Sequence, residues 1–360
     1  MTINKFLFNF SASYSGGGFK RLHAFAKWFN QNGGAYFIIH PRCNDLKNEF
    51  QNNHFIIANQ SRLHRFCNDC DYLDDIQKEI GTPDVYYSYG IPVYFKFGRV
   101  NWFHLSNVLP LGFNGVPQSW YDRLRLSFLG RRITRNYKNV EVISAESNFS
   151  LTKISPKHAS KNFLSVNGGD DEILFYQSRQ VQEKDNIATM VGTYLYKAVE
   201  DSYFVFKMLQ ENNPTLKLII IGDISNIPDH IQSQHDVIMT GLLQREAVIE
   251  RLKKTEYYIS TTHIENSYNA ASEGVFFANE SVISDIGPHR ELLEGMCFDK
   301  ITVPKVTRSM LRVKREDLFI SNLKSWDTIV IDMMSHASLL LSNEKDTKKN
   351  PCSVHTADVL

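Results

Sequence analysis

Two glutamates, Glu265 and Glu273, are the residues of this chain whose type and spacing most suggest chemistry. A predicted strand ends at Ser260, so Glu265 is expected in the following loop and Glu273 inside the next helix. Both carboxylates can then point into a cleft at the carboxyl ends of the strands and accept hydrogen bonds from two sugars. The N-terminus of that helix, which lies between them, offers free N–H groups that suit a diphosphate. Two glutamates at this spacing also occur by chance, so the flanking sequence decides whether they indicate a binding site.

Strands and helices alternate along both halves of the chain. Apolar runs bounded by glycine or polar residues predict strands, and apolar residues at helical spacing predict helices. The predicted strands are 5–10, 36–40, 84–88, 101–104, 140–144, 187–191, 216–221, 237–240, 257–260 and 281–284, and the main predicted helices are 20–30, 200–210, 245–253 and 269–277. This alternation predicts α/β architecture with a doubly wound parallel sheet in each half.

The length of 360 residues is too great for one ordinary core and fits two domains. We place an N-terminal Rossmann-like domain at 1–166, a linker at 167–185, and a C-terminal Rossmann-like domain at 186–335. Residues 336–360 are expected to form a tail or a helix. Two doubly wound domains that face each other leave a cleft at the carboxyl ends of their strands, where such folds bind ligands.

Composition narrows the class of protein. The 40 Lys and Arg residues balance 39 Asp and Glu residues, so no global field favours nucleic acid or lipid. No apolar run approaches the roughly 18 residues of a membrane span, and residues 1–10 lack the pattern of a secretory signal. Five cysteines, a sparse and odd number, favour a reducing compartment, and we expect a cytoplasmic protein. Cys67 and Cys70 lack the second ligand pair of a zinc site.

Five segments, taken in order, resemble the retaining glycosyltransferases of the GT-B fold, glycosyltransferase family 4 in particular. The glutamate pair resembles the E-x(7)-E motif of that family, and the similarity covers roughly residues 3–300. The other four segments are the glycine loop Gly16-Gly17-Gly18 with Arg21, the domain-crossing Asn167-Gly168-Gly169-Asp170, the phosphate segment from Gly192 to Lys197, and residues 281–295.

The resemblance implies a GT-B fold and transfer of a hexose, with retention, from a UDP- or GDP-sugar to a glycan. It implies no metal and no cofactor. By the same resemblance, Glu265 holds sugar hydroxyls, Glu273 binds the nucleotide ribose and Lys197 neutralises the diphosphate. Gly17 and Gly18 would let the backbone approach the phosphates or the sugar.

Further residues are expected at this site. His104 ends a predicted strand, where a histidine of the family lines the sugar pocket, although a core position is equally compatible. Arg21 is a weaker phosphate candidate, and Gly241 and Leu242 lie where the base would bind. The Gly-Phe-Gly that follows the first glutamate in the family is replaced here. Asn266-Ser267-Tyr268-Asn269 stands in its place. We expect Ser267, Tyr268 and Asn269 to contact the donor, and the bulkier side chains of this segment to alter donor specificity or weaken activity.

Other functions stay open at this stage. A GT-B nucleotide-sugar epimerase would need no acceptor, and a glycan- or lipid-binding protein could carry a decayed active site. A dinucleotide-dependent dehydrogenase is disfavoured because Arg21 stands where G-x-G-x-x-G requires its last glycine. Asp69-Cys70-Asp71 resembles the D-x-D metal motif of the GT-A architecture, but its polar surroundings favour a solvated acidic surface.

Residues 120–138 hold six cationic side chains against the single acid Asp122, interleaved with Trp120 and other apolar residues. Upstream, residues 109–113 are expected to form an exposed apolar loop. The pattern fits a helix packed on the sheet with a solvated basic face. It equally fits an interfacial helix on the cytoplasmic face of the inner membrane. The second interpretation suits a polyprenyl-diphosphate-linked acceptor in bacterial O-antigen or surface polysaccharide assembly, with no nucleic-acid partner.

Overall fold

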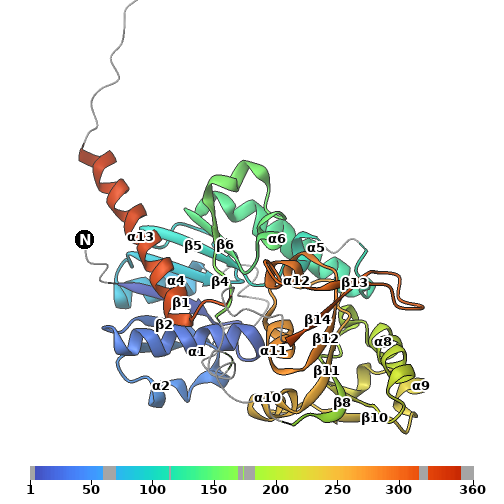
Figure 1. The fold of residues 1–360 in the computed structure, drawn as a ribbon. Helices are drawn as coiled ribbons and strands as arrows, with labels where there is room; N and C mark the ends of the chain where they lie inside the picture. Colours follow the sequence, from blue (N-terminus) through green and yellow to red (C-terminus); the bar gives the residue numbers. More distant parts are fainter. Residues whose placement is uncertain are drawn as a thin grey trace, which may run out of the picture.

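The computed structural model describes residues 5–59, 70–112, 115–168, 173, 183–315 and 323–349. Each half of the chain folds around one sheet (Figure 1). The N-terminal sheet has the order β3-β2-β1-β4-β5-β6-β7 and all its described pairings are parallel. The C-terminal sheet has the order β10-β9-β8-β11-β12-β14-β13. In this sheet β14 is antiparallel to both of its neighbours, β12 and β13. These Rossmann-like orders confirm the predicted pair of doubly wound domains.

The elements of the N-terminal domain are β1 (Phe6–Phe10), α1 (Gly16–Gln31), β2 (Tyr36–Ile39), α2 (Leu46–Glu49), β3 (His54–Ile57), α4 (Cys70–Ile80), β4 (Val85–Tyr89), β5 (Val100–Leu105), η2 (Leu109–Leu111), α5 (Trp120–Asn136), β6 (Val142–Ala145), α6 (Asn148–Leu151) and β7 (Asn162–Leu164). Those of the C-terminal domain are β8 (Asp185–Val191), η5 (Leu195–Lys197), α8 (Val199–Asn212), β9 (Lys217–Ile221), α9 (Asp229–Gln232), β10 (Val237–Gly241), α10 (Arg245–Lys253), β11 (Thr255–Ser260), α11 (Asn269–Phe277), β12 (Glu280–Ser284), α12 (Gly287–Leu292), β13 (Asp299–Ile301) and β14 (Met310–Lys314). The last described helix is α13 (Trp326–Lys349).

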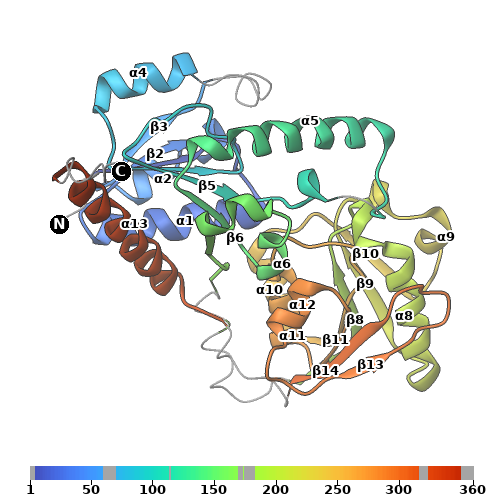
Figure 2. The ribbon, with the colours of Figure 1, turned by 90° about the horizontal axis from the view of Figure 1, so that it is seen from above.

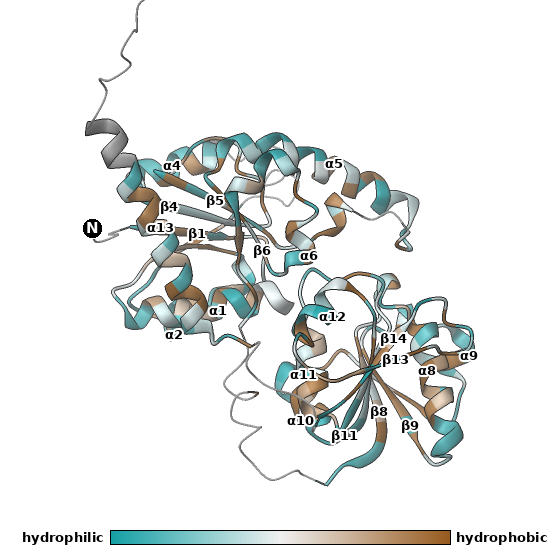
Figure 3. Cartoon of the chain, turned by 45° about the horizontal axis from the view of Figure 1, so that its top comes forward, coloured by the Kyte–Doolittle hydropathy of each residue, from teal (hydrophilic) through white to brown (hydrophobic). Residues whose placement is uncertain are grey.

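Side chains of β1 alternate between two apolar cores because successive residues of a strand face opposite sides of its sheet. Phe8 and Phe10 pack with Phe25 of α1 on one face, whereas Leu7 packs with Tyr86 on the other. In the C-terminal domain, β9 is apolar and buried from its second residue onward. Figure 3 shows hydrophobic residues along the strands of this sheet and on the helices that pack against it. Burial on both faces therefore places these strands in the centre of each domain.

Helix α13 returns from the C-terminal domain to the N-terminal one. It packs beside α1 (Figures 1 and 2), with Val330 and Met333 buried in the core that contains Phe25. Residues 326–335, which the sequence analysis assigned to the C-terminal domain, therefore pack with the N-terminal domain. The apolar side chains of this helix need a partner surface, and α1 and β5 provide it. Most of the expected linker, residues 169–172 and 174–182, lies outside the described residues, as do Cys67 and Asp69.

The predicted apolar loop at 109–113 is not exposed as expected. Leu109 and Pro110 form part of η2 and are buried. A Cβ atom on Gly130 of α5 would lie 2.1 Å from the carbonyl oxygen of Pro110, so the absence of a side chain there lets α5 pack directly on η2. Phe113 lies outside the described residues.

Candidate active site

A cavity of about 620 Å³ lies between the two domains. Its N-terminal wall contains the start of α1, the start of α5 and the segments that follow β4, β5 and β6. Its C-terminal wall contains η5 and residues 264–267, 269 and 270. The carboxyl ends of parallel strands from both sheets therefore meet at one space, as expected for a doubly wound fold.

Lys197 and Glu265 are in contact on the C-terminal side of this space. The ammonium of Lys197 forms an ion pair with Oε1 of Glu265, and the two side chains are only 12% and 20% exposed. Local structure positions the lysine: Gly192 has φ of +92°, which favours glycine, and the aliphatic stem of Lys197 lies beside it. Thr261 Oγ1 donates to the carbonyl oxygen of Ala198 at 2.8 Å, which ties η5 to the end of β11.

Glu273 lies apart from that pair and does not line the cavity. Its carboxylate oxygen Oε1 accepts from Arg245 at 2.7 Å and from Lys20 at 3.3 Å. Lys20 belongs to α1 and Arg245 to α10, so this ion-pair cluster joins the two domains. The structure thus brings together two of the three charged groups expected to converge and holds the third in a neighbouring cluster.

The glycine loop forms the first turn of α1. Ser15 occupies the N-cap position without a side-chain hydrogen bond, and Gly17 and Gly18 line the cavity. The N–H groups of this turn have no partners within the helix, which suits an anion. A Cβ on Gly17 would lie 3.0 Å from Nδ2 of Asn269, which belongs to the other domain. The absence of side chains thus permits the two walls to approach closely.

His104 does not line the cavity, contrary to the sequence expectation. It is fully buried, with Nε2 3.5 Å from Oε1 of Glu146. Burial lowers the pKa of His104 to about 4, and the positive charge of Arg21 acts in the same direction. His104 is therefore neutral at pH 7, and it contacts Glu146 from a position that does not line the cavity. The imidazole is turned away because its neighbours on β4 and β6, Tyr89 and Ser144, stack on it and bond to it.

Glu146 lines the cavity in its place and was missed by the sequence analysis. It is 4% exposed and follows directly after β6. Burial by itself would raise the pKa of Glu146, but hydrogen bonds from His104 and Asn266 and the charge of Arg21 hold it below its usual range. The available signal was its place directly after a predicted strand, where ligand-contacting residues collect in α/β folds.

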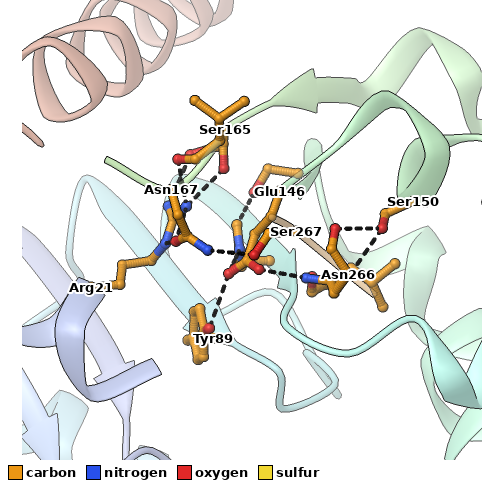
Figure 4. Close-up of polar contacts among 12 residues, drawn as sticks. Arg21, Tyr89, Glu146, Ser150, Ser165, Asn167, Asn266 and Ser267 are labelled. Carbon is orange, nitrogen blue, oxygen red and sulfur yellow. Dashed lines mark hydrogen bonds and ion pairs between the residues drawn. The ribbon is translucent and has the colours of Figure 1, made fainter. Parts of the chain in front are cut away.

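Arg21 is also placed differently from the sequence expectation. Its guanidinium is fully buried and donates to the carbonyl oxygens of Ser165 and Val166 and to Oδ1 of Asn167 (Figure 4). These acceptors lie where the chain leaves the N-terminal domain. Because its donors are already engaged there, Arg21 holds the domain-crossing segment and is not available to a phosphate.

Of the remaining predicted site residues, two line the cavity and three do not. Ser267 and Asn269 line the cavity, whereas Tyr268 is buried in the apolar core. Gly241 ends β10 with φ of +70°, and Leu242 is 83% exposed; neither lines the cavity.

Asn266 connects the two walls. Its Nδ2 donates to Oε2 of Glu146 at 2.7 Å and to the carbonyl oxygen of Leu105 at 3.1 Å. Its own carbonyl oxygen accepts from the hydroxyls of Ser147 and Ser150 at 2.8 and 2.9 Å. Figure 4 shows this network reaching from the N-terminal domain to the loop that follows Glu265. The side chain that replaces a glycine of the resembled family therefore fastens one domain to the other.

Sequence comparison finds no matching family model and no matching curated protein. Solved structures do resemble the chain. The Anabaena protein HepE in complex with UDP-glucose has a TM-score of 0.55 at 14% identity, over 96% of this chain and 94% of that one. Sucrose-phosphate synthase from Thermosynechococcus elongatus has a TM-score of 0.64 at 11% identity, over 94% and 100%. WaaG, a glycosyltransferase involved in lipopolysaccharide biosynthesis, has a TM-score of 0.52 at 11% identity, over 75% and 78%.

Likeness at this level of identity establishes the fold alone. The chain has the GT-B fold, with two Rossmann-like domains that face a cavity. Within the described ranges, no helix has both the length and the apolar character needed to cross a bilayer.

Proposed function

We propose that this chain is a glycosyltransferase that moves a hexose, with retention, from a UDP- or GDP-sugar to a glycan acceptor. The observation that carries the proposal is one cavity between the domains that Glu265 and the N-terminus of α1 both line, with Lys197 held against Glu265 by an ion pair. A fold does not define an activity, so the argument depends on this site. The HepE structure holds UDP-glucose, which supports a nucleotide sugar as the donor.

Each group has a chemical task in the proposed transfer. The first-turn N–H groups of α1, at Gly17 and Gly18, and the ammonium of Lys197 stabilise the diphosphate as negative charge develops on it. Glu265 accepts hydrogen bonds from hydroxyls of the transferred sugar. Glu273, which Arg245 and Lys20 hold through Oε1, accepts hydrogen bonds from the ribose hydroxyls. The acceptor hydroxyl attacks from the face that the diphosphate leaves, and none of these steps uses a metal.

Nucleotide binding tests the proposal most directly. A thermal-shift panel of UDP-, GDP- and related sugars is expected to identify a stabilising donor, because a ligand at 100 times its Kd adds about 2.7 kcal/mol to the free energy of unfolding. Calorimetric titrations that are silent with both UDP and GDP would instead favour a glycan-binding protein.

Glu265→Gln tests the transfer step. Loss of a hydrogen bond to a charged group should lower the rate of transfer, or of slow donor hydrolysis, by about tenfold to a hundredfold. Glu250→Gln is the matched control, since Glu250 is an exposed glutamate of the same domain, paired with Lys253. Equal rates in wild type and Glu265→Gln would remove Glu265 from the active site.

We further propose that α5 contacts the cytoplasmic face of the inner membrane and that the acceptor is lipid-linked, in O-antigen or surface polysaccharide assembly. Trp120, Leu124 and Phe128 recur every four residues along α5 and are 75%, 63% and 47% exposed. Exposed arginines, among them Arg123 and Arg131, accompany this apolar stripe. Flotation with anionic liposomes should carry the wild-type protein but not a Leu124→Glu/Phe128→Glu variant. Absence of wild-type binding at low salt would rule out the contact.

A further inference from the structure

Glu146 is a buried carboxylate on the N-terminal wall of the cavity, in the other domain from Glu265. Three donors surround it. Its Oε1 accepts from the hydroxyl of Tyr89 at 3.1 Å and faces Nε2 of His104 at 3.5 Å. Its Oε2 accepts from Asn266 at 2.7 Å. An ionised carboxylate offers about four acceptor positions, so one position on Oε2 is left for a ligand in the cavity.

The surrounding donors determine the direction of each hydrogen bond. The indole N–H of Trp102 can only donate, and it lies 2.7 Å from Oγ of Ser144. The Ser144 hydroxyl can still donate, and Nδ1 of His104 lies 2.8 Å away. The ionised Glu146 can only accept, so the ring nitrogen that faces it must carry the proton and Nδ1 accepts from Ser144. Neutral His104 then carries its proton on Nε2 and donates it to Glu146. This chain of donors stabilises the ionised form of Glu146 and leaves it acting only as an acceptor.

Charge on the cavity lining agrees with this role. Among the described lining residues, the carboxylates are Asp122, Glu146 and Glu265, whereas Arg125 is the only guanidinium. Arg125 is itself paired with Asp122 at 3.0 Å. Glu265 is likewise paired with Lys197, whereas the side chains that donate to Glu146 are all uncharged. The wall at Glu146 therefore suits a hydroxyl group and repels an anionic acceptor placed against it, while the proposed diphosphate site lies at the first turn of α1 and Lys197.

We propose that Glu146 selects the acceptor: its carboxylate accepts a hydrogen bond from a hydroxyl of an uncharged sugar and discriminates against acidic sugars such as uronic acids. This inference rests on the proposed transferase function and adds the substrate class of its acceptor side. Asn266 is the positioning residue, because it holds Oε2 of Glu146 from the other domain.

The test measures binding of methyl glycosides to the full-length protein saturated with UDP or GDP, by ligand-observed NMR. Methyl glucoside, galactoside and mannoside represent neutral acceptors, and methyl glucuronide represents acidic ones. In wild type, at least one neutral glycoside should bind about tenfold or more tightly than the glucuronide. Glu146→Gln should reduce this ratio to about one, with nucleotide affinity unchanged.

Glu141→Gln is the matched control. Glu141 lies just before β6, accepts from Lys96 and Asn101, and does not line the cavity, so its substitution should leave the ratio unchanged. Equal affinity of wild type for neutral and acidic glycosides overturns the inference, as does the absence of neutral glycoside binding or a ratio that Glu146→Gln leaves intact. If Glu146→Gln does not fold, the wild-type comparison still decides. Failure of UDP and GDP to bind counts against the transferase instead; the same glycoside comparison, made on the protein without nucleotide, then decides the role of Glu146 by itself.

Discussion

Among the described residues, His104, His263 and His289 are held in surroundings that strongly favour the neutral imidazole. Burial lowers the pKa of His104 and His289 to about 4, and burial together with the charge of Arg308 does the same for His263. The ordinary pKa of histidine is about 6.5, which is the value expected in the unfolded chain. Between these two values the unfolded state binds more protons than the folded state, so stability rises with pH.

Acidification should therefore destabilise the protein between about pH 6.5 and pH 4. For each fully buried histidine, the apparent free energy of unfolding should fall by about 1.4 kcal/mol per pH unit across that interval. Urea unfolding followed by circular dichroism at pH 7.5, 6 and 5 measures the slope. His289→Asn should reduce the slope of the free energy of unfolding against pH by the contribution of one titrating histidine. His235→Asn, at an exposed position, should leave the slope unchanged. An identical slope in His289→Asn and wild type would contradict this assignment.

At the scale of elements, the first turn of α1 is enclosed by both domains. A Cβ on Gly18 would lie 2.8 Å from Oγ of Ser13 and 2.9 Å from Cε1 of Tyr89. Tyr89 cannot move freely, because its ring stacks on His104 and its hydroxyl donates to Glu146. The position of α1 is therefore coupled through tight packing to the carboxylate of Glu146 on the same wall of the cavity.

Gly18→Ala should destabilise the protein by about 1–3 kcal/mol, as expected for overpacking, and weaken nucleotide binding. Gly112→Ala is the control. A Cβ at Gly112 would make an ordinary contact of 3.6 Å with Lys153, and the backbone of Gly112 is extended, with φ of −170°. Thermal unfolding and UDP or GDP titration provide the two measurements. Wild-type affinity and stability in Gly18→Ala would show that the turn has room to adjust.

At the scale of the whole molecule, the segment that begins α6 contacts the C-terminal domain. Asn266 accepts from the hydroxyls of Ser147 and Ser150, and Glu291 accepts from the backbone N–H groups of Asn148 and Phe149 at 2.8 and 2.7 Å. All these bonds would be lost if the domains separated. They hold the two cavity walls together, as the proposed transfer between sites on different domains requires.

The double variant Asn266→Ala/Glu291→Ala should shift the molecule toward more open arrangements. The variant keeps the backbone carbonyl of Asn266 but removes its Nδ2 bonds to Glu146 and Leu105 and both bonds of Glu291. Each hydrogen bond to a charged group contributes about 1.5–3 kcal/mol, so small-angle X-ray scattering should give a larger radius of gyration than for wild type, and transfer should slow by about tenfold or more. Glu246→Ala, at an exposed site on α10, should change neither. Scattering indistinguishable from wild type would show that other contacts maintain the arrangement.

Local sequence was sufficient to determine the architecture. The apolar runs that form β1 and β9, and the helical spacing within α1 and α8, predicted two doubly wound domains because periodicity is imposed by secondary structure itself. The same local signals located Glu265 and Lys197 after strand ends. Short elements such as β3, β7 and β13 were missed, since three or four residues carry little periodic signal.

Only the tertiary structure decided which side chains reach the cavity. His104 and Arg21 have suitable chemistry and suitable places in the sequence, yet neighbouring strands and the domain-crossing segment enclose both. Glu146 faces the cavity because Tyr89, His104 and Asn266 arrive from three distant segments to hold it. Likewise, α13 is apolar on one side, but its partner surface on α1 exists only after both domains fold. Contacts between residues far apart in the chain have no local pattern, so spacing alone cannot specify them.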